Sequence, residues 1–98
     1  MRIIHRLAQR DIKEAYQWYR FQSVKAANRF ADDVRESLLA IELFPDRFPI
    51  HEHGTRALIL RRFPYVIVYL VENDRPFVVA VAHAKRRPGY WRRRLRRR

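Results

Sequence analysis

The sequence predicts a single α+β domain, and three observations support that prediction. The chain has 98 residues, which is enough for one domain with a hydrophobic core but not for two. Through the first half, apolar residues recur every three or four positions, as they do on one face of a helix. In the second half they gather in short runs rich in β-branched and aromatic side chains. The expected order is therefore one strand, two helices and three strands.

The N-terminal part of the chain predicts a short strand followed by a helix. Residues 2–7 alternate between apolar and polar well enough to indicate the strand. The helix after it would bury a stripe with helical spacing: Ala8, Ile12, Ala15, Tyr16 and Tyr19. We expect Asp11 in the first turn of this helix, where a carboxylate suits the positive end of the helix dipole.

A second helix is predicted from Ser23 to Phe44. The Ser23 hydroxyl can cap it by accepting an otherwise unpaired amide of the first turn. Pro45 ends it, because the residue before a proline is pushed out of the α region. Its buried stripe would consist of Ala27, Phe30, Ala31, Val34, Leu38 and Ile41. Since the link between the helices is so short, we expect them to form an antiparallel hairpin.

Three antiparallel strands are predicted after a proline-containing loop at residues 45–54. They cover residues 55–62, 65–72 and 77–84, and a four-residue turn at 73–76 joins the last two. These last two strands are apolar on successive residues, which is expected where both faces of a sheet are covered. The helical hairpin would cover one face, and we expect a partner on the other.

Positive charge is concentrated at the C-terminal end. The chain carries 22 Lys and Arg against 10 Asp and Glu, and nine of the basic residues lie after residue 84, where there are no acidic ones. Residues 1–84 are therefore close to balance, at a net charge of +3. We divide the chain into a folded domain at 1–91 and a basic tail at 92–98. Arginine clusters of this kind bind polyanions through counterion release, so an acidic physiological partner is expected.

Three segments carry a resemblance to the RelE/ParE superfamily of bacterial toxins. Residues 61–69, RRFPYVIVY, resemble the middle-strand signature of that family. Residues 83–91, HAKRRPGYW, are similar to its closing pattern of His, then Arg, Pro and Tyr-Trp. Residues 8–19 resemble its first helix. The resemblance implies the toxin of a type II toxin–antitoxin (plasmid stabilisation) module, silenced by an acidic antitoxin in a hetero-oligomeric complex.

The resemblance leaves two modes of action open. RelE-like members cut messenger RNA on the ribosome, and ParE-like members poison DNA gyrase. If the protein is a ribonuclease, the resemblance implies His83, Arg86 and Tyr90 as its catalytic residues. The ribonuclease branch, however, places an arginine directly after the aromatic residue that Tyr65 matches, and here that residue is Val66. The gyrase branch is therefore favoured, and with it a non-catalytic action.

The residues expected to bind the target or the antitoxin are Arg61, Arg62, Arg86, Arg87, Tyr90 and Trp91. Four of these residues also have a structural interpretation. The two arginines at 61 and 62 could be solvated charges beside a strand, and the two aromatic residues could fold back onto the sheet. His83 could be a structural histidine bonded to a backbone group. A plain nucleic-acid-binding module, with the tail as its functional part and the aromatics stacking on bases, is a further alternative.

Two further groups of charged or histidine residues do not predict a functional site. Asp32, Asp33 and Glu36 share a helix face and are interpreted as solvated charges. The His51-Glu52-His53 run lacks the helical H-E-x-x-H spacing of a zinc site. We expect no metal and no cofactor. No apolar stretch is long enough to cross a bilayer, and no signal peptide is evident, so the cytoplasm is the expected location.

Overall fold

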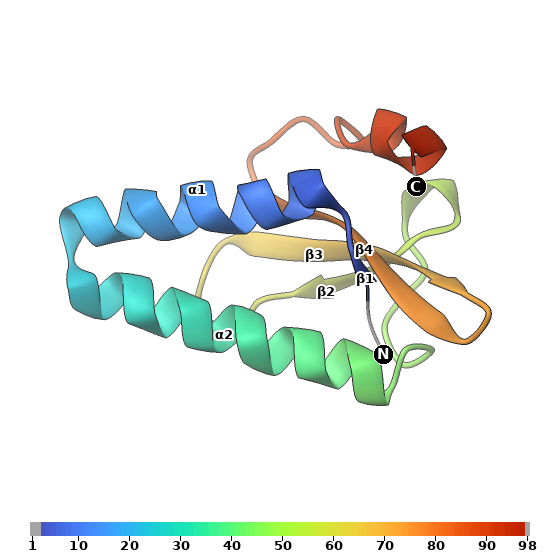
Figure 1. The fold of residues 1–98 in the computed structure, drawn as a ribbon, viewed down its shortest axis with the longest axis horizontal. Helices are drawn as coiled ribbons and strands as arrows, with labels where there is room; N and C mark the ends of the chain where they lie inside the picture. The colour runs from blue at the N-terminus through green and yellow to red at the C-terminus, as the bar shows by residue number, and fades with distance from the viewer. Residues whose placement is uncertain (1–2, 98) are drawn as a thin grey trace.

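A helical hairpin covers one face of a four-stranded sheet in the computed structural model, which describes residues 3–97 (Figure 1). The α+β class and the element order predicted from the sequence are confirmed. The elements are β1 (Ile3–Ile4), α1 (Arg6–Gln22), α2 (Val24–Leu43), β2 (Arg56–Ile59), β3 (Tyr65–Glu72) and β4 (Arg75–His83). Short 3-10 helices lie at Glu52–Gly54 and Arg92–Arg97.

The start of α1 differs from the prediction. The helix begins at Arg6, and His5 caps it, because the His5 Nδ1 accepts a hydrogen bond of 3.0 Å from the Leu7 amide. The first strand is therefore only two residues long. Asp11 is the sixth residue of α1, so its expected place in the first turn is wrong. The cap of α2 is as predicted, since Ser23 Oγ accepts the Ala26 amide at 3.2 Å.

The strand β1 makes the sheet mixed. The strand order is β1-β4-β3-β2, with β1 parallel to β4 and the other pairs antiparallel. The expected turn at 73–76 is shorter, because Glu72 pairs with Arg75 and only Asn73 and Asp74 lie between them. Both have positive φ, at 52° and 63°, as a type I′ hairpin turn requires. Asn and Asp tolerate this conformation better than other residues with a side chain.

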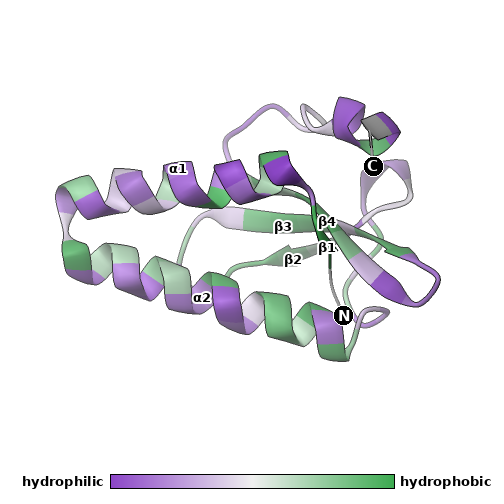
Figure 2. Cartoon of the chain, in the orientation of Figure 1, coloured by the Kyte–Doolittle hydropathy of each residue, from purple (hydrophilic) through white to green (hydrophobic). Residues whose placement is uncertain are grey.

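Each face of the sheet has its own hydrophobic cluster. The helix-side cluster contains Phe30 and Ile41 from α2 with Tyr69 from β3, and Tyr69 donates its hydroxyl to the Pro45 carbonyl at 2.6 Å. Figure 2 shows the strands as largely hydrophobic and the helices as striped. The opposite face carries a second cluster of Val68, Val79, Ala80 and Trp91. The chain's own C-terminal segment therefore covers part of the face that was expected to receive a partner.

His5 gives the fold a pH dependence. Burial lowers the pKa of His5 below its usual 6.5, and the positive charges of Arg94 and Arg6 lower it further, while Asp11 opposes them. Because the folded state resists protonation of His5, its contribution to stability is complete above pH 6.5 and is lost as the pH falls through the lowered pKa. We expect the free energy of unfolding to fall below pH 6.5 by at most about 1.4 kcal/mol per pH unit.

Urea unfolding at several pH values measures this effect. His5→Asn keeps a side-chain acceptor for the cap but does not titrate. The difference in free energy of unfolding between the two proteins should therefore change as the pH falls below 6.5. A His5→Asn variant whose pH profile matches that of the parent between pH 7.5 and 5 would contradict the assignment.

Candidate target and partner site

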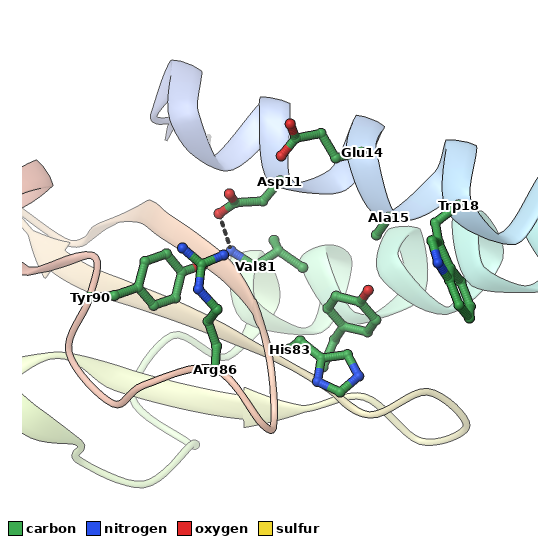
Figure 3. Close-up of a pocket in the computed structure, with 9 residues that line it drawn as sticks. Asp11, Glu14, Ala15, Trp18, Val81, His83, Arg86 and Tyr90 are labelled. Atoms are coloured by element: carbon green, nitrogen blue, oxygen red, sulfur yellow. Dashed lines mark hydrogen bonds between the residues drawn. The ribbon is translucent and has the colours of Figure 1, made fainter.

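A groove lies between α1 and the C-terminal end of β4, with a volume of about 220 Å³ (Figure 3). It brings together the three residues that the RelE resemblance implies as catalytic, and α1 supplies its other wall. The lining residues are Asp11, Glu14, Ala15, Trp18, Tyr65, Val81, His83, Arg86 and Tyr90.

Tyr90 contacts two guanidinium groups. The Arg86 guanidinium carbon lies 4.0 Å from the ring centroid, and that of Arg94 lies 5.4 Å away. Burial raises the pKa of the Tyr90 hydroxyl, and the Asp11 carboxylate adds to the rise, while Arg94 and Arg86 oppose it. Tyr90 therefore stays protonated at neutral pH. It presents a hydrogen-bonding hydroxyl on a ring whose orientation is fixed by cation–π contacts.

The main chain fixes the orientation of His83. Its Nδ1 accepts a hydrogen bond of 3.0 Å from the Lys85 amide, and its ring lies edge-on to Tyr65 at 5.0 Å between centroids. This contact agrees with the structural interpretation of His83. In the neutral ring the hydrogen is then on Nε2, because Nδ1 is occupied as an acceptor.

Asp11 and Arg94 form a nearly buried ion pair beside the groove. Arg94 donates to both Asp11 oxygens, at 2.6 and 3.2 Å, and the two side chains are only 13% and 12% exposed. Such two-point pairs are among the strongest hydrogen-bonded contacts in proteins. This pair was not predicted from the sequence, because 83 positions separate its members and no local pattern connects them.

The same pair continues the hydrogen bonding along the edge of β4. The parallel pairing with β1 ends at Val78, so the next part of this edge has no strand beside it. There the Asp11 carboxylate accepts the Val81 amide at 3.0 Å, and Arg94 donates to the Val79 carbonyl at 3.1 Å. Side chains from α1 and from the C-terminal segment thus replace a strand.

Trp91 is a core residue. It is only 2% exposed, packs against the second face of the sheet and contacts the rings of His51 and His53 at 6.2 and 6.0 Å between centroids. The expectation that Trp91 provides a surface for a target is therefore not met in this structure. The structural interpretation, in which it folds back onto the sheet, is the one observed. Val66 packs against the same cluster and does not line the groove.

Arg61 and Arg62 are exposed in the β2–β3 connection, apart from the groove. The Arg62 amide donates to the Asp33 carboxylate at 3.0 Å, and Asp33 is buried. The expectation that Asp33 is a solvated charge is therefore wrong, whereas Asp32 and Glu36 are exposed. The missed signal was the position of Asp33 beside Val34 on the buried side of α2.

The described residues hold no group of three His, Asp or Glu side chains able to ligate a metal, and this includes the 51–53 run. Within residues 3–97, no helix is both long and apolar enough to span a membrane.

Comparison with known families assigns the chain. A family model described as the ParE toxin of the type II toxin–antitoxin system parDE matches residues 2–88. The chain belongs to this family. No curated protein matched the sequence. The matched region contains α1, the whole sheet and Arg86, but it ends before Tyr90, Trp91 and Arg94. The toxin's C-terminal segment, with its buried tryptophan and its ion pair to Asp11, therefore lies outside the matched residues.

Proposed function

We propose that this toxin poisons DNA gyrase and that the segment from Arg86 to Tyr90 makes the contact. The observation that carries the proposal is the match to the ParE family over residues 2–88, because ParE-like members of the superfamily act on gyrase. Arg86 and Arg87 are exposed in the turn that follows β4, where the Arg86 amide donates to the His83 carbonyl at 2.9 Å. Gly89, at φ 75°, turns the chain back so that Tyr90 lies beneath Arg86.

Tyr90 and Arg86 are suited to act as contact residues. Aromatic and arginine side chains dominate the energetics of protein interfaces, and a preordered pair loses little conformational entropy on binding. The guanidinium of Arg86 also offers charge-assisted hydrogen bonds to a carboxylate or a phosphate. We leave Trp91 out of this contact because it is buried.

Membership of a toxin–antitoxin module gives the toxin a cognate antitoxin. We propose that an acidic, amphipathic antitoxin segment covers an apolar groove of about 400 Å³ beside the edge strand β2. Ile50 and Ile59 line this groove and are 73% and 77% exposed, which is unusual for residues of this size. Arg61 follows β2 closely and would pair with antitoxin carboxylates. The net charge of +12 favours such a partner at long range.

A supercoiling assay tests the gyrase proposal. Purified toxin, titrated into gyrase with relaxed plasmid, should block supercoiling and accumulate cleaved gyrase–DNA complexes, and the antitoxin should relieve both effects. Tyr90→Ala and Arg86→Ala should each raise the inhibitory concentration at least about tenfold, which corresponds to about 1.4 kcal/mol of lost binding energy.

Arg75→Ala is the matched control, because Arg75 is exposed at the opposite end of β4. It should inhibit like the parent. Folded toxin that binds antitoxin but leaves gyrase unaffected at micromolar concentration would remove gyrase as the target. Because His83, Arg86 and Tyr90 do share one groove, RelE-like cleavage is the second candidate. Codon-specific breaks in translated messenger RNA, abolished by Arg86→Ala, would assign it.

A further inference from the structure

Exposed arginines and apolar side chains packed on the sheet alternate along the C-terminal segment from Trp91 to Arg96. Arg92, Arg93 and Arg96 are exposed. Trp91 and Leu95 instead pack against the second face of the sheet. We call the three exposed side chains the arginine ridge.

The Asp11–Arg94 ion pair holds the ridge in place. Arg94 lies between Arg93 and Leu95 in sequence, and its guanidinium is bonded to α1 through Asp11 and to β4 through the Val79 carbonyl. Together with the burial of Trp91, these contacts fix the segment on both sides of Arg92 and Arg93. Binding through the ridge therefore requires less ordering of the chain than binding through a flexible tail.

The chemistry of the ridge favours phosphates over a protein surface. Its apolar neighbours face inward, so the ridge offers guanidinium groups without the apolar area that an amphipathic peptide needs for stable docking. Lys85, Arg86 and Arg87 are also exposed, and the sequence from Ala84 to the end contains no acidic residue to repel a polyanion. Arginine forks match phosphate oxygens at two points.

We propose that the arginine ridge binds the phosphate backbone of duplex DNA without sequence preference. This inference goes beyond the proposed gyrase contact and does not depend on it, because the ridge and Tyr90 can be changed separately. A toxin that binds both gyrase and the adjacent DNA backbone would be retained on the gyrase–DNA complex.

The test is the salt dependence of binding to a fluorescent 25-base-pair duplex. Each phosphate neutralised contributes about −0.9 to the slope of log K against log salt concentration. Replacing Arg92, Arg93 and Arg96 by Gln should reduce the magnitude of that slope by about two to three and weaken binding at least about tenfold near 100 mM salt. All three side chains are exposed, so the variant should fold.

The matched control removes the same charge from the helices. Lys13, Arg20 and Lys25 are exposed on the hairpin, which covers the other face of the sheet. Replacing these three residues by Gln should leave the slope nearly unchanged. Equal losses in the two triple variants would overturn the proposal, because they would show a response to net charge alone. Failure of the parent to bind at low salt would also overturn it.

Competition distinguishes DNA from an acidic protein partner. Inorganic polyphosphate should displace the duplex, and polyglutamate at equal charge concentration should displace it far less. Equal displacement by polyglutamate would assign the ridge to acidic proteins and would overturn the proposal. Gyrase inhibition by the ridge variant is measured separately. Failure of the DNA-binding proposal can therefore be told apart from failure of the gyrase proposal.

Discussion

Replacing Trp91 with alanine is expected to lower the free energy of unfolding by about 3–5 kcal/mol, the range for a large aromatic residue removed from a core. Trp91 is 2% exposed and packs with Val68, Val79 and Ala80, so its removal leaves a cavity against the second face of the sheet. A loss of this size is a large fraction of the stability of a small domain. Urea unfolding followed by far-ultraviolet circular dichroism measures it.

Trp18 provides the matched control within the same chain. It is 58% exposed on α1, so Trp18→Ala should change the free energy of unfolding by only about 0.5 kcal/mol. If both variants cost the same small amount, the C-terminal segment does not pack on the sheet as described.

Local signals in the sequence were sufficient for much of the fold. The cap of α2 at Ser23 and the whole of β3 at residues 65–72 agree with the structure, because a hydroxyl before an apolar stripe and a run of β-branched residues act over a few positions. The turn between β3 and β4 was expected at residues 73–76, and the structure has a turn of two residues, Asn73 and Asp74, at that place. Pro76 suggested a turn, yet it lies in β4, buried, opposite Val71.

Long-range contacts account for what the sequence could not predict. The apolar character of β3 and β4 correctly indicated that both faces of the sheet are covered, but not that Trp91 covers the second one. A tryptophan beside a run of arginines looks like a surface residue, since its neighbours are solvated. Only part of the candidate site could be predicted, because its other residues also come from a distant part of the chain. His83, Arg86 and Tyr90 belong to one contiguous motif, whereas their neighbours on α1 become visible only in three dimensions.

The buried Asp11–Arg94 pair should show a large coupling free energy in unfolding experiments. Asp11→Ala is expected to cost about 3 kcal/mol, because it leaves Arg94 without its counter-ion and the Val81 amide without an acceptor. Arg94→Ala should cost about 2 kcal/mol, and the double variant should cost about 2 kcal/mol less than the sum of the two. Urea unfolding of the four proteins in a double-mutant cycle gives these values.

The Asp32–Arg35 pair shows how much of that coupling depends on burial. Its nitrogen–oxygen distance is 2.9 Å, close to that of the buried pair, but its side chains are 64% and 71% exposed. A cycle on this pair should give a coupling below about 0.5 kcal/mol that vanishes in 0.5 M salt. The Asp11–Arg94 coupling should persist at that salt concentration, because solvent ions reach it poorly. Equal, salt-sensitive couplings in the two cycles would mean that Arg94 spends its time in solvent, and the arginine ridge would then lack its anchor.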